Sequence, residues 1–125
     1  MKELRLKKCA ECGSLVRIIN NCTCDNCDLT CCGKTMQEVK ANSVDASFEK
    51  HIPTYEVDKD NMIIKVNHVM DADHYIEWIL VQTKNNNLEL TLEPNDNPAL
   101  TVPYEKGAII YAYCNKHGLW KTEVK

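Results

Sequence analysis

Hydrophobic and polar residues alternate along much of the chain after residue 48, which is the pattern of β-strands with one buried face. Leu88, Leu90 and Leu92 alternate with acidic residues and threonine, so the three leucines are predicted to share one face of a strand. Three asparagines at 85–87 separate this strand from the apolar segment 75–83. Turn residues between two such segments favour a hairpin, so the two strands are predicted to pair.

A second hairpin is predicted at DKDN, residues 58–61, which separates the segments 52–57 and 62–66. The apolar segment AIIYAYC at 108–114 is predicted to form a further strand. No segment keeps hydrophobic residues at helical spacing for a dozen residues. Short strands joined by turns predict a mainly β domain over residues 48–125, an antiparallel sandwich or barrel of about 80 residues.

The first 36 residues, which we call the head, contain few large hydrophobic side chains. A segment shorter than roughly 40 residues seldom folds on a hydrophobic core alone, so the head needs an additional restraint. A bound metal ion would supply one, because structural thiolate sites bind zinc with about 10–16 kcal/mol. Residues 37–47, QEVKANSVDAS, are polar and are predicted to connect the head to the β domain.

The charge of the chain excludes some classes of function. It has 15 Lys and Arg against 18 Asp and Glu, a net charge of −3 and a pI near 5.8. A binding surface for nucleic acid is usually basic, so we expect no nucleic-acid partner. No apolar run approaches the roughly 18 residues of a membrane span, and the start MKELRLKKCAECG has no apolar region of an export signal. These features predict a cytoplasmic, reducing location, where clustered cysteines are metal ligands more often than disulfides.

Seven of the eight cysteines lie in the first 32 residues. Cys9 and Cys12 form a CxxC pair, and the adjacent pair Cys31 and Cys32 follows, with Gly33 behind it. A CxxC turn brings two thiolates to one ion, and a second pair completes a tetrahedral site. Both zinc and iron accept four thiolates, although zinc ribbons normally space the second pair as CxxC. The spacing therefore predicts a metal site without fixing the metal.

Three further cysteines, Cys22, Cys24 and Cys27, lie between the two pairs. The simplest interpretation is that they are spare thiols in an insertion. Two alternatives remain open, namely exchange with the later pair as metal ligands and a second metal ion in this loop.

The remaining metal-binding side chains lie far from the head. Cys114 and His117 have the spacing of a chelating turn, and His68 and His74 flank a short loop that could bring both rings to one ion. His51 stands alone in FEKHIP at 48–53. Each of these side chains taken singly is ordinary, but jointly they indicate a second metal site.

These motifs together resemble one family over essentially the whole chain: desulfoferrodoxin, the two-iron superoxide reductase. The resemblance rests on CxxC and CCG in the head, EKHIP, the H-x5-H segment ending in IEWI, and CNKHGLW. It implies a desulforedoxin-like head and an immunoglobulin-like β-sandwich, with iron in both. The implied ligands of the head iron are Cys9, Cys12, Cys31 and Cys32. The implied ligands of the active iron are four equatorial imidazoles and an axial thiolate, His51, His68, His74, His117 and Cys114.

The resemblance also implies an activity, the one-electron reduction of superoxide to hydrogen peroxide without release of dioxygen, for defence against oxidative stress. Lys50 would guide superoxide to the open iron position and help to stabilise peroxide, and Glu49 would occupy that position once iron is oxidised. Rubredoxin or a similar carrier would supply electrons, and the protein would be a homodimer. One thiolate and four neutral imidazoles leave ferrous iron with a formal charge of +1, which attracts an anion, and a sixth position stays open.

The sequence departs from the family pattern at two places. Relatives often have proline after the first histidine of H-x5-H, where Val69 stands here, which predicts a less rigid loop. The extra head cysteines are the second departure. Two other functions are compatible with the residues, a zinc-binding adaptor and a pure electron carrier, and metal analysis and reaction with superoxide would separate them.

Overall fold

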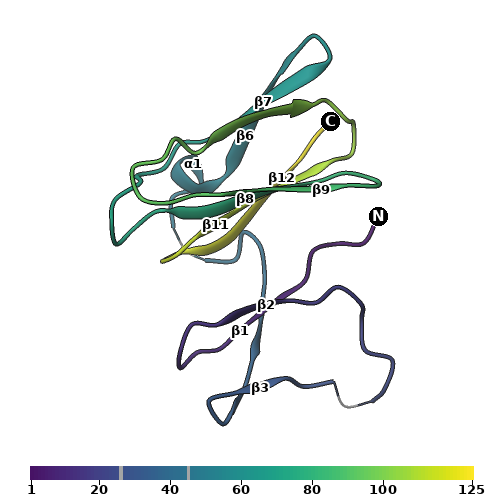
Figure 1. Cartoon of the computed structure of the whole chain (residues 1–125), viewed down its shortest axis with the longest axis vertical. Coiled ribbons are helices and arrows are strands. Elements are labelled where there is room, and N and C mark those ends of the chain that lie inside the picture. The colour runs from purple at the N-terminus through teal and green to yellow at the C-terminus, as the bar shows by residue number, and fades with distance from the viewer. Residues whose placement is uncertain (26, 45) are drawn as a thin grey trace. The chain divides into compact units, whose positions relative to one another are not determined.

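The computed structural model describes residues 1–25, 27–44 and 46–125, and of residues 48 and 49 it describes the backbone only. The chain divides into two compact units, Lys2–Lys40 and Ala41–Lys125, and Met1 is grouped with the second (Figure 1). Strands make up nearly all of the regular structure, which confirms the prediction of a mainly β protein. The assignment of residues 1–36, 37–47 and 48–125 to head, linker and enzyme domain stays a prediction.

The first unit is built from five short strands with little core. A three-stranded antiparallel sheet has the order β2-β1-β5, and β3 pairs with β4 in a separate hairpin. The strands are β1 (Leu6–Lys8), β2 (Leu15–Arg17), β3 (Thr30–Cys31), β4 (Lys34–Thr35) and β5 (Gln37–Val39). Its buried hydrophobic residues, among those described, are Leu6, Cys9 and Met36. Strand β5 lies in the segment that was predicted to be a connector. Its sequence is polar, but its backbone pairs with that of β1.

The second unit contains two antiparallel sheets, of order β10-β7-β6 and β12-β11-β8-β9. The strands are β6 (Pro53–Asp58), β7 (Asn61–Val66), β8 (Ile76–Gln82), β9 (Asn87–Thr91), β10 (Ala99–Pro103), β11 (Ile109–Cys114) and β12 (Gly118–Glu123). Both predicted hairpins are confirmed, because β6 pairs with β7 and β8 pairs with β9 in antiparallel register. The fifth predicted strand, 108–114, corresponds to β11 (Ile109–Cys114).

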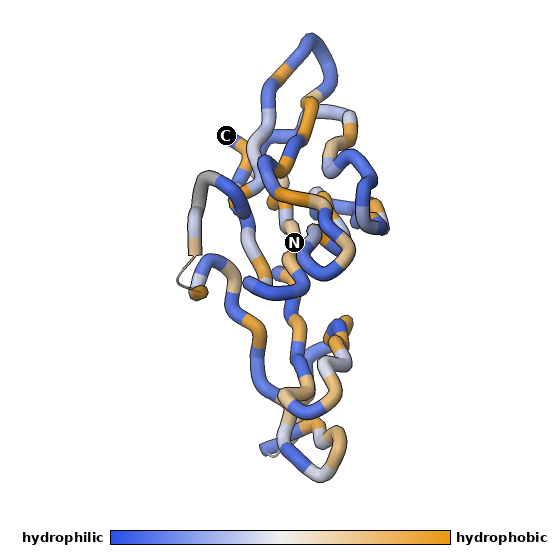
Figure 2. The backbone as a smooth tube through the Cα atoms, turned by 90° about the vertical axis from the view of Figure 1, so that its left-hand side faces the viewer, coloured by the Kyte–Doolittle hydropathy of each residue, from blue (hydrophilic) through white to orange (hydrophobic). Residues whose placement is uncertain are grey.

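The core of the second unit draws hydrophobic side chains from both sheets. Met62 and Ile64 of β7 are fully buried together with Ile110 of β11. The tube in Figure 2 changes between hydrophilic and hydrophobic colours along the chain, as expected for strands with one buried face. Among the alternating leucines, Leu92 is buried, whereas Leu88 is 46% exposed because β9 is an edge strand of its sheet.

One short helix, α1 (Phe48–His51), precedes β6. The hydrophobic pattern did not predict it, since a single turn is too short to leave a helical period. In the described residues, no helix is both long enough and apolar enough to cross a membrane.

Candidate metal centres

Five metal-binding side chains from separate segments converge at one end of the four-stranded sheet. His51 ends α1, His68 and His74 lie in the β7–β8 loop, Cys114 ends β11, and His117 lies in the β11–β12 turn. The ligand atoms of all five lie within 4.8 Å of one another. The structure therefore brings together the five residues that the resemblance implied, from positions up to 66 residues apart.

The four imidazole rings surround a common centre. Ring centroids are 4.7 Å apart for His51 and His68, 4.6 Å for His68 and His74, 5.1 Å for His74 and His117, and 4.8 Å for His117 and His51. The diagonal from His51 to His74 is longer, 6.4 Å. Consecutive rings are steeply inclined, by 71 to 88°. The four rings thus follow one another around a quadrilateral, and each offers a nitrogen atom within 4.8 Å of those of the others.

For two of the four rings, a hydrogen bond to the backbone decides which nitrogen faces the centre. His51 Nδ1 lies 2.6 Å from the carbonyl oxygen of Ser47 and donates to it, so Nε2 is directed inward, 3.0 Å from Nδ1 of His117. His68 Nδ1 donates to the carbonyl oxygen of Val69. A ring nitrogen held in this way fixes the tautomer and leaves the other nitrogen to bind metal.

Two of the inward nitrogens are orphaned, and this tests whether a metal ion fits. Nε2 of His68 and Nε2 of His74 are buried, and neither has a hydrogen-bond partner in the described residues. A buried polar atom without a partner costs roughly 1–3 kcal/mol, so such atoms in a native protein indicate a missing ligand. A cation at the centre would satisfy both lone pairs. The residues present therefore fit a metal ion.

Burial keeps these imidazoles in the form that binds metal. Desolvation lowers the pKa of His68 and of His74 from the ordinary value of 6.5. The hydrogen bond to Val69 acts in the opposite direction on the pKa of His68, but two adjacent imidazolium charges would repel each other, so His51 further lowers the pKa of His68 and His117 that of His74. Both rings are consequently neutral at pH 7 and present lone pairs.

Cys114 supplies the single sulfur ligand from a fully buried position. The register between β11 and β8 shifts between Tyr113 and Cys114, so that Glu77 is left opposite no residue. Such a bulge redirects the strand, and bulges are frequent beside active sites. The backbone N–H of His117 donates to Cys114 Sγ over 3.4 Å, which holds the sulfur beside the β11–β12 turn.

Two residues that the sequence did not single out hold the site together. Trp120 stacks on the ring of His51, with centroids 4.9 Å apart and planes 27° apart. The amide of Asn115 accepts from the N–H of Tyr75 and donates to the carbonyl of Asp73, each over 3.0 Å. Asn115 thereby joins the two loops that carry His74 and His117. Its position between Cys114 and His117 was the only signal that could have pointed to it.

The loop with Val69 is closed by its own hydrogen bonds. The N–H of Asp71 donates to the carbonyl of His74 over 3.0 Å, and the N–H of His74 donates back over 3.3 Å. The N–H of Ile76 donates to Met70 Sδ over 3.4 Å. These bonds restrain the loop without the proline that many relatives are expected to have at this position.

Comparison with known proteins gives the same result as the geometry. The sequence profile of the family described as Desulfoferrodoxin matches residues 43–123. The chain belongs to the desulfoferrodoxin family. The desulfoferrodoxin of Syntrophotalea carbinolica is 36% identical over 126 residues, 98% of each chain, and that of Nitratidesulfovibrio vulgaris is 30% identical over 97% of each. A solved structure, the superoxide reductase from Treponema pallidum, aligns with a TM-score of 0.71 at 26% identity, over 98% of this chain and all of the other.

The full-length relatives extend the desulfoferrodoxin similarity through the head, where a second cluster forms. The sulfur atoms of Cys9, Cys12, Cys31 and Cys32 lie within 4.8 Å of one another. The CxxC turn is closed by the N–H of Gly13 donating to the carbonyl of Cys9 over 2.9 Å. This cluster contains the four head cysteines implied by the resemblance.

The four head thiols cannot all ionise without a cation. Hydrogen bonds from the backbone N–H groups of Cys12 and Glu11 lower the pKa of Cys9 to about 7. Its side-chain hydrogen bonds with Cys9 and Cys12 raise the pKa of Cys31 to about 12. The first thiolates therefore hinder ionisation of the next, and a bound metal cation would remove this conflict. The residues of this desulfoferrodoxin head also fit a metal ion.

The structure describes the side chain of only one of the two predicted catalytic residues. Lys50 is exposed and directly precedes His51 in α1. The side chain of Glu49 lies outside the described residues, so its predicted role stays a prediction.

Cys22, Cys24 and Cys27 form a third group that shares no member with the four-cysteine cluster.

Proposed function

We propose that this chain is a superoxide reductase that reduces superoxide by one electron to hydrogen peroxide and releases no dioxygen. The observation that carries the proposal is the cluster of four imidazoles and one thiolate, whose ligand atoms lie within 4.8 Å of one another. Five ligands on a metal that accepts six leave one position for a substrate. The superoxide reductases of Treponema pallidum and Pyrococcus abyssi are among the similar proteins.

The donor set favours iron as the metal at both sites. Zinc has no redox chemistry and is usually satisfied by four ligands, whereas the large site offers five. Iron accepts both four thiolates and mixed nitrogen and sulfur ligands. When bound, iron in the five-ligand site would supply the electron for superoxide and would be restored by an external donor. The head cysteines Cys9, Cys12, Cys31 and Cys32 would hold the second iron.

The protein's own residues would prepare this site for an anion. The hydrogen bond from His51 to Ser47 and the stack on Trp120 fix one imidazole, and burial keeps His68 and His74 neutral. Neutral imidazoles add no charge, so ferrous iron and one thiolate together would give the site a formal charge of +1. This charge attracts superoxide although the chain as a whole carries −3.

Lys50 and Glu49 would act at the entrance to the site. A cation close to the open position raises the local concentration of an anionic substrate, and screening over about 8 Å at physiological salt leaves local charges in control. The carboxylate of Glu49 would occupy the open position after oxidation. We further propose rubredoxin or a similar carrier as electron donor, a homodimer, and a reducing cytoplasm, where metal-binding thiols persist.

Metal analysis combined with rapid mixing tests the function. We expect two irons per chain and formation of one hydrogen peroxide for each superoxide consumed, with no dioxygen. Zinc alone, without visible absorption, would indicate a structural adaptor and contradict the proposal. Two irons that do not react with superoxide would indicate a pure electron carrier.

Replacement of Lys50 by alanine is expected to slow the reaction with superoxide about tenfold, the low end of the range for electrostatic steering. The loss of one cation should also weaken the decrease of the rate with added salt. Pulse radiolysis or stopped-flow mixing at several ionic strengths measures both. Lys50→Arg should keep most of the rate. Lys106→Ala is the matched control. Lys106 lies just before the first residue of β11, whereas Cys114 is the last residue of that strand. An unchanged rate in Lys50→Ala would remove this lysine from the mechanism.

A further inference from the structure

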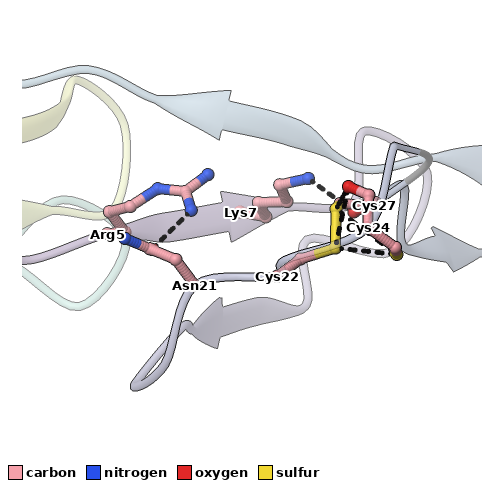
Figure 3. The surroundings of a disulfide bond; sticks show 6 residues. All are labelled: Arg5, Lys7, Asn21, Cys22, Cys24 and Cys27. Atoms are coloured by element: carbon pink, nitrogen blue, oxygen red, sulfur yellow. Dashed lines mark hydrogen bonds between the residues drawn. A yellow bond between two sulfur atoms is a disulfide. The ribbon is translucent and has the colours of Figure 1, made fainter.

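The three cysteines of the head insertion form a compact sulfur cluster of their own. Cys22 and Cys27 are joined by a disulfide with Cα atoms 5.8 Å apart, an ordinary separation for such a bond. Cys24 Sγ lies 3.1 Å from Cys22 Sγ and 3.8 Å from Cys27 Sγ (Figure 3). A third sulfur thus lies within contact distance of both disulfide sulfurs, and attack of a thiolate on a disulfide sulfur is the step by which thiol–disulfide exchange proceeds.

Strand β1 and the residues before it hold both ends of this loop. Arg5 Nη1 donates to Asn21 Oδ1 over 2.8 Å, directly before Cys22. Lys7 Nζ lies 3.5 Å from the carbonyl oxygen of Cys27, at the other end (Figure 3). Contacts to two residues of one short segment, Arg5 and Lys7, bring the ends of the insertion together, so the proximity of the sulfurs is built into the fold of the first unit.

The cluster is open to small reactants and lies beside positive charge. A surface pocket of about 190 Å³ is lined by Arg5 and Lys7 together with Cys22 and Cys27. Cys22 and Cys24 are exposed, and Cys27 is half-buried. The exposure of Cys22 and Cys24 admits a peroxide or a thiol from solvent to the sulfur atoms. These are the surroundings of a reactive cysteine and not those of a buried structural one.

We propose that Cys22, Cys24 and Cys27 form a dithiol–disulfide site that reduces hydrogen peroxide. One thiolate of the Cys22 and Cys27 pair attacks a peroxide oxygen, the O–O bond breaks, and the departing hydroxide takes a proton to form water. The second thiolate attacks the sulfur of the sulfenic acid so formed, the S–O bond breaks as the S–S bond forms, and the departing hydroxide takes the proton that the second thiol gave up, which makes a second water. Two thiols thus give two electrons to one peroxide, and the products are one disulfide and two waters.

Cys24 makes the oxidised site exchangeable. Its thiolate attacks one sulfur of the disulfide, a new S–S bond forms to that sulfur, and the displaced sulfur leaves as a thiolate that takes up a proton. Exchange moves the disulfide without changing the number of electrons. A dithiol reductant then restores all three thiols and becomes a disulfide itself. Transient disulfides of this kind are the ones found in reducing compartments.

This inference rests on the proposed function only for the origin of the peroxide. Superoxide reduction at the large site would release hydrogen peroxide, a neutral molecule that diffuses freely. The cysteine site would consume part of that product. Adding peroxide directly tests the cysteine site independently, because its chemistry requires neither superoxide nor the active iron.

The experiment maps disulfides in the full metal-loaded protein. The protein is reduced, freed of reductant, treated with hydrogen peroxide near one equivalent, and alkylated. Trypsin and a protease that cleaves before aspartate then separate Cys27 from the peptide that holds Cys22 and Cys24. We expect loss of two of the three alkylatable thiols in this segment, one link between the two peptides, and reversal by a dithiol.

Serine variants sharpen the result. Cys22→Ser should still link Cys24 to Cys27, because those sulfurs are 3.8 Å apart. The triple variant C22S/C24S/C27S should form no link, consume less peroxide, and retain both metals and the rate of superoxide reduction. Three alkylatable thiols after peroxide treatment would overturn the proposal. A third metal equivalent that the triple variant loses would also overturn it, since the cluster would then be a metal site.

Discussion

Replacing Cys114 by serine is expected to lower the rate of superoxide reduction at least about a hundredfold and to erase the visible thiolate-to-iron charge-transfer band. The reason is that Cys114 is the only sulfur among the five converging ligands, and its side chain is fully buried. A thiolate donates electron density to iron and favours reduction of oxygen species, whereas a buried serine hydroxyl does so weakly. Stopped-flow mixing with superoxide and visible spectra of the oxidised protein measure the two effects.

The head provides the control for this variant. The spectrum of the head iron should be intact in Cys114→Ser, because its four ligands are different residues. Cys12→Ser should give the reciprocal result and alter the head spectrum while the active-site band remains. A charge-transfer band that survives in Cys114→Ser would show that another thiolate binds the active iron.

Loss of the head metal is expected to unfold the head and leave the second unit folded. The first unit buries only Leu6, Cys9 and Met36 among its described hydrophobic residues, too few to offset the entropy of ordering about 39 residues. Thiolate metal sites contribute about 10–16 kcal/mol, so the folded head depends on the metal. Cys9→Ser removes the most buried of the four ligands. Hydrogen exchange should show lost amide protection in β1, β2 and β5 and unchanged protection in β8 and β11.

Cys24→Ser is the matched control for the head variant, since it changes an exposed cysteine outside the four-thiol cluster. It should leave the head metal and the amide protection of the first unit unchanged. Protection that persists in Cys9→Ser after metal loss would contradict the requirement for metal.

The sequence predicted those parts of the fold that depend on local patterns. The two hairpins β6/β7 and β8/β9 followed from alternating residues on either side of short polar turns. Strands β10 and β12 and the short strands β1 to β4 were not predicted. Helix α1 and strand β5 were missed as well, because one is a single turn and the other is polar. Both are held by interactions with distant residues and leave no periodic signal.

The candidate ligands were named from spacing and resemblance, but the residues that hold these ligands in place were not. Asn115 bonds to Tyr75, 40 residues earlier in the chain, and Trp120 stacks on His51, 69 residues earlier. Nothing in the local sequence of either residue indicates these contacts. The cluster of Cys22, Cys24 and Cys27 was visible as spacing, yet its interpretation needed the sulfur separations.

The sequence by itself determined the family, the mainly β architecture and the residue types that gather at two metal centres, because motifs and alternation are written in the order of residues. The tertiary structure decided which atoms face each centre. His51 presents Nε2 because Ser47 binds its other nitrogen, whereas His117 presents Nδ1. It also decided that the three remaining cysteines lie in contact with one another, since only the fold of the first unit closes the ends of that loop.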